Sequence, residues 1–68
     1  MTKYLITEQK IYSLENVKKI TYEIHKNDDH DIVIYYFDST CEWIECGKGE
    51  EGKALAEARL ASIKMKLE

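Results

Sequence analysis

The sequence predicts an α+β domain in which an antiparallel meander of four to five strands carries one C-terminal helix packed across one face. Three observations support this class. Residues 18–26 alternate between apolar and polar side chains, glycines at 47 and 49 interrupt the strand pattern, and strong helix formers follow from Glu50 onward. A chain of 68 residues has room for one small domain, 1–68, in which Leu67 and Glu68 are interpreted as a candidate cloning remnant.

Local composition predicts each strand. Five strands are expected, over residues 4–6, 10–13, 18–26, 32–37 and 41–46. The third is the clearest, because Ile20, Tyr22 and Ile24 alternate with polar residues. The fourth is apolar throughout, as is typical of a strand covered on both faces. Polar connections separate the strands, at residues 7–9, 14–17, 27–30 and 38–40.

The expected helix begins at about Glu50 and has a narrow apolar stripe. At 100° per residue, one face carries Ala56, Leu60, Ile63 and Leu67, and we expect this face to be buried. Glycine costs about 1 kcal/mol relative to alanine inside a helix. Gly52 therefore predicts a first turn that frays.

The lengths of the turns decide which side chains share a face of the sheet. Two-residue loops at Asp28-Asp29 and Ser39-Thr40 would place Ile24 opposite Val33, and Tyr35 opposite Ile44. In this register the face under the helix carries Ile20, Tyr22, Ile24, Val33, Tyr35, Phe37, Ile44 and Cys46. The other face carries Ile32, Ile34, Tyr36 and Trp43. A change of one residue in either turn exchanges the two faces of one strand.

The face without a helix is the candidate interface. Because one helix covers only one of two apolar faces, we expect a second copy to cover Ile32, Ile34, Tyr36 and Trp43, which gives a homodimer. In the alternative, the N-terminal strands fold over this face as a half-barrel. Their apolar side chains are Tyr4, Leu5, Ile6, Ile11 and Tyr12.

Charge and hydropathy exclude several classes of protein. The net charge of −3 comes without the cluster of basic residues that nucleic-acid binding needs. The longest apolar run, residues 32–37, is far shorter than the ~20 residues that span a membrane. No apolar core of a signal peptide follows the first residues, so we expect a cytoplasmic protein with reduced thiols and with neither nucleic acid nor membrane as a partner.

The densest group of potential metal ligands lies in the turn at residues 25–31. It contains His25, Asp28, Asp29, His30 and Asp31. Imidazole and carboxylate together suit zinc, manganese or iron. The spacing matches no metal motif, however, and a polar hairpin turn explains the same residues. We therefore expect no resident metal or cofactor.

Candidate catalytic groups are not paired in the expected fold. Cys41 and Cys46 stand five positions apart in one strand, about 17 Å from each other and on opposite faces. We expect Cys46 to be a small core residue and Cys41 a partly exposed thiol. Glu42 and Glu45 also point to opposite faces, so they do not form an acid–base pair. The sequence therefore predicts a protein that is not an enzyme.

Apolar spacing gives a resemblance to known proteins. The segments at 13–20 and 32–36, then Trp43-Ile44 and a helix that begins Glu-Glu and is rich in alanine, resemble small bacterial proteins of unknown function. In these proteins, meandering strands end in one C-terminal helix, an order similar to the closing half of pleckstrin-homology-like domains. The resemblance implies the fold given above and no catalytic residue. The loops lack the basic cluster of a lipid-binding surface.

These observations together predict a non-enzymatic, small cytoplasmic interaction or assembly module. The alternative is a ligand- or metal-responsive regulatory module that uses the turn from His25 to Asp31.

Overall fold

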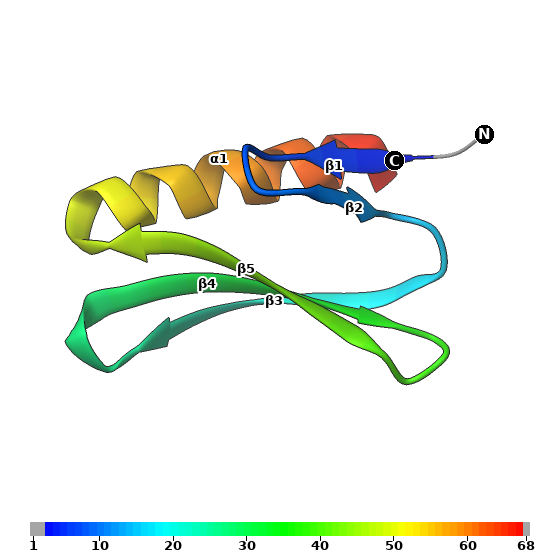
Figure 1. Cartoon of the computed structure of the whole chain (residues 1–68), viewed down its shortest axis with the longest axis horizontal. Coiled ribbons are helices and arrows are strands. Elements are labelled where there is room, and N and C mark those ends of the chain that lie inside the picture. The colour runs from blue at the N-terminus through cyan, green and yellow to red at the C-terminus, as the bar shows by residue number, and fades with distance from the viewer. Residues whose placement is uncertain (1–2, 68) are drawn as a thin grey trace.

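The computed structural model describes residues 3–67, which form two layers (Figure 1). One layer is an antiparallel sheet in the order β3-β4-β5, formed by β3 (Val17–His25), β4 (Asp29–Tyr36) and β5 (Cys41–Lys48). The other layer holds an antiparallel pair of strands, β1 (Tyr4–Ile6) and β2 (Ile11–Ser13), beside the helix α1 (Gly49–Leu67). The α+β class, the five strands and the helix on one face are confirmed. The strands form two sheets, divided between β2 and β3, and Glu68 lies outside the described residues.

The strands β1 and β2 form a short hairpin that buries one side. Leu5 pairs directly with Tyr12, and both side chains are buried. The hydroxyl of Thr7 closes the turn, because it accepts hydrogen bonds from the backbone N–H groups of Gln9 and Lys10. A side-chain oxygen in this position satisfies backbone donors that the short hairpin leaves free.

The register between β3 and β4 differs from the expected one. His25 pairs with Asp29, so the loop is the three-residue 3₁₀ turn Lys26–Asp28. Asn27 and Asp28 adopt the left-handed conformation, with φ of 66° and 59°, which these residue types tolerate. Ile24 consequently faces His30 and not Val33. This is a shift of three residues, and an odd shift exchanges the faces of a strand.

The turn between β4 and β5 is also longer than expected. The N–H of Tyr36 donates to the carbonyl of Thr40, and Ser39 has a positive φ of 74°. Tyr35 therefore pairs with Cys41 and not with Ile44. Both registers of β4, with β3 and with β5, thus differ from the expected ones by three residues. Each odd shift reverses β4 relative to its neighbour, so β3 and β5 keep the expected faces and only β4 exchanges its two faces.

The reversal of β4 makes the expected uncovered patch wrong. Ile32 and Ile34 are fully buried beneath the helix and hairpin, and Tyr36 is partly buried. Trp43 lies on the opposite face, so these four residues do not form one surface. The alternative, in which N-terminal strands cover this face, matches the burial of Leu5 and Tyr12. The other three apolar side chains of the N-terminal strands, Tyr4, Ile6 and Ile11, are exposed.

The core joins both layers. Its buried residues are Leu5, Tyr12, Leu14, Ile32, Ile34, Ile44, Cys46, Ala56 and Ile63. The expected helix stripe is confirmed for Ala56 and Ile63, with Leu60 packed against the core, while Leu67 is exposed at the end of α1. The helix packs mainly on β4 and β5. Within residues 3–67, no helix has the length and apolar character needed to cross a membrane.

Gly52 has a packing role where β5 meets α1. A Cβ atom at this position would overlap the carbonyl carbon and oxygen of Gly47 and lie 3.2 Å from its Cα atom. Gly52 is buried within α1, which begins at Gly49, and fraying of this first turn stays a prediction. Gly47 itself has a positive φ of 109°, and the strand turns into the helix there. The two glycines therefore allow the backbones of β5 and α1 to touch.

Candidate functional site

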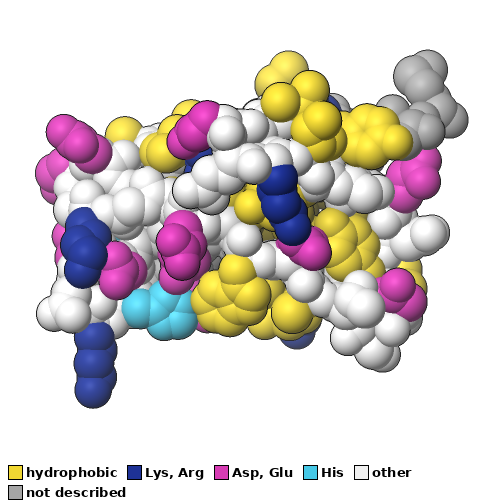
Figure 2. Space-filling model, in the orientation of Figure 1, with side chains coloured by type: hydrophobic (Ala, Val, Ile, Leu, Met, Phe, Trp, Pro, Cys, Tyr) yellow, Lys and Arg dark blue, Asp and Glu magenta, His cyan; other side chains and the backbone are white. Residues whose placement is uncertain are grey.

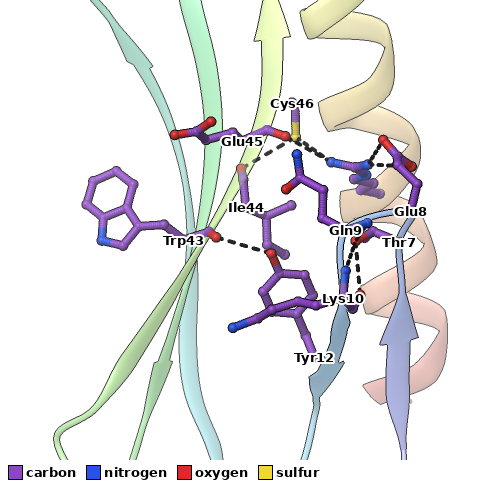
Figure 3. A network of polar contacts seen from close by, with 10 residues as sticks. Thr7, Glu8, Gln9, Lys10, Tyr12, Trp43, Ile44, Glu45 and Cys46 are labelled. Atoms are coloured by element: carbon purple, nitrogen blue, oxygen red, sulfur yellow. Dashed lines mark hydrogen bonds and ion pairs between the residues drawn. The ribbon is translucent and has the colours of Figure 1, made fainter.

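The face of the sheet that points away from α1 is the candidate functional site, and we call it the outer face. Figure 3 shows the side chains of Trp43 and Glu45 pointing away from the hairpin and helix, opposite to Ile44. Side chains alternate along a strand, so pairing places their cross-strand neighbours on the same side. The outer face contains Lys19, Thr21, Glu23, His25, Asp31, Val33, Tyr35, Cys41, Trp43 and Glu45.

Trp43 is the largest apolar side chain on the outer face and is 49% exposed. It pairs directly with Val33, whose side chain is fully buried although no helix covers it. The indole also lies 5.7 Å from the ring of His25, measured between centroids. Trp43 thus shields Val33 on one side and offers about half of its surface to a partner.

A row of three carboxylates crosses the outer face next to Trp43. Glu23 pairs with Asp31, and Asp31 pairs with Glu45, one from each strand of the sheet. His25 Nε2 lies 3.3 Å from carboxylate oxygens of both Glu23 and Asp31. The hydroxyl of Thr21 donates to Glu23 at 3.1 Å. In the described part of the chain, none of the three carboxylates forms an ion pair with lysine or arginine.

Like charges directly opposite each other destabilise a sheet. The acidic row therefore costs folding free energy, and it creates a negative potential beside an exposed aromatic ring. Figure 2 shows hydrophobic side chains next to a histidine and acidic side chains on the sheet side of the molecule. A small hollow of about 180 Å³ lies at the end of the row, lined by Asp29, Asp31, Glu45 and Gly47.

The second histidine of the predicted cluster lies on the inner side of the sheet. His30 is 3% exposed, and its Nδ1 atom lies 2.7 Å from the hydroxyl of Tyr22. Its Nε2 atom lies 3.0 Å from the carboxylate of Asp28. Burial, followed by the nearby carboxylate of Glu57, raises the pKa of Tyr22, so its phenol stays protonated. Both ring nitrogens of His30 are engaged, and neither is free to bind a metal or substrate.

The His and Asp side chains of residues 25–31 do not converge on one metal site. His25 belongs to the outer face, and His30 with Asp28 belongs to the inner side. Among residues 3–67, no three His, Cys, Asp or Glu side chains converge as a metal site requires. These residues are close along the chain, but the alternation of side chains along the strands places them on opposite faces of the sheet.

The two cysteines lie on opposite faces, as the spacing predicts, and both are free thiols. Cys41 is exposed, and Cys46 is buried. Burial raises the pKa of the Cys46 thiol, and the guanidinium of Arg59 opposes this effect. Glu42 and Glu45 are likewise separated, since Glu42 forms an ion pair with Lys10 near the hairpin.

A larger cleft of about 640 Å³ lies between the hairpin and the β4–β5 turn. Several of its polar groups bind one another. Lys10 pairs with Glu42 and sits 4.9 Å from the centre of the Tyr12 ring, and the hydroxyl of Tyr36 donates to the carbonyl of Ser13. The contacts that line this cleft therefore hold the hairpin against the sheet.

Side chains from the second layer cap the free edge of β5 (Figure 3). The hydroxyl of Tyr12 donates to the carbonyl of Trp43 at 3.4 Å. Arg59, whose side chain is 10% exposed, donates to the carbonyl of Glu45 at 3.1 Å and also binds the carboxylate of Glu8. For the described residues, no side chain is bonded to the outer edge of β3 in this way.

No protein-family model, curated protein or solved structure matches this chain. The resemblance to pleckstrin-homology-like domains therefore stays a prediction.

The structure separates the predicted interface residues and brings unforeseen ones together. Trp43 keeps its place on an open face, but its neighbours are Val33 and Tyr35 in place of Ile32 and Ile34. The acidic row was not found from the sequence, because its three members are far apart in the chain and align only in the observed register.

Proposed function

We propose that the protein is a non-enzymatic interaction module of the cytoplasm whose outer face binds a basic segment of a partner protein. The observation that carries the proposal is the half-exposed ring of Trp43 beside the acidic row of Glu23, Asp31 and Glu45. A lysine or arginine of the partner would contact the row, and its cation or aliphatic stem would lie on the indole.

The contacts of the titratable groups support binding over catalysis. His30 uses both ring nitrogens in hydrogen bonds inside the protein. The raised pKa of Cys46 keeps this buried group a thiol and not a nucleophilic thiolate. His25 is held by two carboxylates on an open surface, where 43% of its side chain is exposed.

The expected binding is weak and depends on salt. An exposed cation–π contact contributes about 0.5–1 kcal/mol, and each exposed ion pair about 0.2–1 kcal/mol. A few such contacts, together with burial of part of the Trp43 ring, give a dissociation constant of about 0.1–1 mM. Salt reduces the affinity because these charges lie at the surface.

Fluorescence of Trp43 tests the proposal directly. The chain has a single tryptophan, so its emission reports on the outer face alone. A synthetic peptide of alternating lysine and valine is titrated against the protein, and a peptide of alternating glutamate and valine serves as the matched control. We expect a saturable blue shift with the basic peptide only.

Variants then locate the binding charge. Asp31→Asn and Glu45→Gln should each weaken the basic peptide, whereas Glu57→Gln on the exposed side of α1 should leave its affinity unchanged. Equal binding of both peptides, or equal effects of all three variants, contradicts the proposal. No emission change with the basic peptide at millimolar concentration also overturns it.

A further inference from the structure

The outer edge of β3 has free backbone hydrogen-bonding groups. The carbonyls of Trp43 and Glu45 accept bonds from side chains beyond the sheet, so they point away from β4. Bond direction alternates along antiparallel strands, and Val33, which pairs with Trp43, must therefore direct its N–H and C=O toward β3. Val33 pairs with Thr21. The backbone groups of Ile20 and Tyr22, on either side of Thr21, consequently point outward from the free edge.

We propose that two copies of this chain pair through these β3 edges, antiparallel about a two-fold axis at Thr21, to form one six-stranded sheet. Glu23 belongs both to this edge and to the acidic row of the proposed function, but the proposed function is tested through Asp31 and Glu45, so either proposal can fail alone. Each sheet contributes the three strands β3, β4 and β5. The outward groups of Ile20 in one copy and Tyr22 in the other supply the new backbone hydrogen bonds, once on each side of the axis.

The sequence of β3 is complementary to itself in this register. Lys19 of one copy lies opposite Glu23 of the other, which places opposite charges together twice on the outer face. Ile20 lies opposite Tyr22 of the second copy on the inner side, and Thr21 meets Thr21 at the axis. Opposite-charge, aromatic with β-branched, and threonine pairs are the cross-strand combinations that stabilise antiparallel sheets.

Neighbouring registers lack this match. The alternation of backbone groups allows shifts by two residues only, because inward-pointing groups cannot pair. Such a shift places Lys19 opposite Thr21 in one direction and opposite His25 in the other. Both charge pairs are lost in either case. A β-bulge between Val17 and Lys19 also makes Lys19 the first residue of the regular part of the edge.

The inner side of β3 is incompletely covered in a single copy. Because α1 packs mainly on β4 and β5, Ile24 is 63% exposed and Ile20 and Tyr22 are only partly buried. Pairing at the β3 edge sets Tyr22 of the second copy directly beside Ile20, and Ile20 of the second copy beside Tyr22, with Ile24 diagonal to that Ile20. Apolar surface of Ile20 and Tyr22 is then buried on both sides of the axis.

Light scattering coupled to size exclusion tests the pairing. One chain has a mass of 8.0 kDa, and we expect a species of about 16 kDa, twice this value, that dissociates on dilution from millimolar to micromolar concentration. Lys19→Glu and Glu23→Lys each replace both opposite-charge pairs with like-charge pairs. Each variant should therefore raise the dissociation constant by about tenfold or more.

The register itself is tested by mixing the two variants. In a mixed dimer, the carboxylates of the Lys19→Glu chain meet the amines of the Glu23→Lys chain at both positions, so the mixture should regain the 16 kDa species, twice the 8.0 kDa of one chain. Lys64→Glu, an exposed charge reversal near the end of α1, is the matched control and should dimerise like the wild type. Circular dichroism confirms that every variant is folded.

Three results would overturn the proposal. The first is a wild-type mass of 8.0 kDa at every concentration. The second is a dimer that neither charge reversal weakens, because this places the contact elsewhere. The third is a folded mixture of Lys19→Glu and Glu23→Lys that stays monomeric, because opposite charges then do not meet in the pairing.

Discussion

Replacing Gly52 with alanine separates two physical effects of opposite sign. Helix propensity alone predicts that Gly52→Ala stabilises α1 by about 1 kcal/mol. Packing predicts the reverse, because the new Cβ atom would come closer than 3.0 Å to the carbonyl of Gly47, a distance that real Cβ atoms essentially never show. The obstructing atoms belong to the backbone of β5, so no side-chain rotation relieves the overlap.

The size of the effect follows from these two terms. Overpacking in a well-filled region costs about 1–3 kcal/mol, and a rigid backbone contact places this site at the upper end. After the gain of about 1 kcal/mol from propensity, we expect a net loss of about 2 kcal/mol. For a domain of 60–100 residues, this lowers the melting temperature by roughly 8–16 °C. A chain of this size has only about 3–10 kcal/mol of stability in total.

Thermal and urea unfolding followed by circular dichroism measure this loss. Ala54→Gly, at an exposed position of the same helix turn, is the control for propensity and should cost about 1 kcal/mol. If Gly52→Ala raises the melting temperature, the close approach of β5 and α1 is not what Gly52 provides, and the packing argument is refuted.

Three further predictions concern single side chains. Tyr22→Phe should cost about 1–3 kcal/mol in urea unfolding, because it leaves the buried Nδ1 atom of His30 without a partner; an unchanged midpoint would contradict the bond. Trp43→Ala should cost about 1.5–2.5 kcal/mol, roughly half the value for a fully buried ring, and a loss above ~4 kcal/mol would mean that the indole is covered. Hydrogen bonds from the side chain and backbone of Thr40 lower the pKa of Asp38, so this carboxylate stabilises the fold above its ordinary pKa of 3.8, and the contribution is lost as the pH falls through the lowered pKa. The melting temperature of Asp38→Asn should consequently fall less steeply than that of the wild type below pH 3.8, and parallel curves would refute the assignment.

Signals that are local in the sequence predicted the elements well. The alternation around Tyr22 and the composition after Glu50 locate a strand and a helix because each pattern depends on neighbours within a few residues. The buried stripe of Ala56 and Ile63 follows from helical periodicity in the same way. The burial of Cys46 and exposure of Cys41 follow from strand alternation.

The lengths of the turns were less predictable than the strands and the helix. Residues 27–30 are all compatible with a turn, and several loop lengths are consistent with this composition. The structure selects the three-residue loop through the left-handed conformations of Asn27 and Asp28. This choice reverses β4 and moves Ile32 from the predicted surface to the core.

The candidate site depends on the same choice. Trp43 was identified from the sequence as part of an open face, and its exposure agrees with that interpretation. Its true neighbours were missed, because Glu23, Asp31 and Glu45 line up only in the observed register. The role of Gly52 was missed for a different reason: composition shows the cost of glycine in a helix, but not the backbone that it must touch.

The two side chains that cap the edge of β5 come from opposite ends of the chain. Tyr12 is synthesised 31 residues before Trp43, whose carbonyl it binds, whereas Arg59 is synthesised 14 residues after Glu45. One cap on β5 therefore comes from the hairpin that precedes it in the chain, and the other from the helix that follows it. A chain with α1 undocked would keep only the Tyr12 contact on the β5 edge, and exposed strand edges are the sites where unrelated chains join. Docking of α1 thus protects the β5 edge against aggregation as well as covering the core.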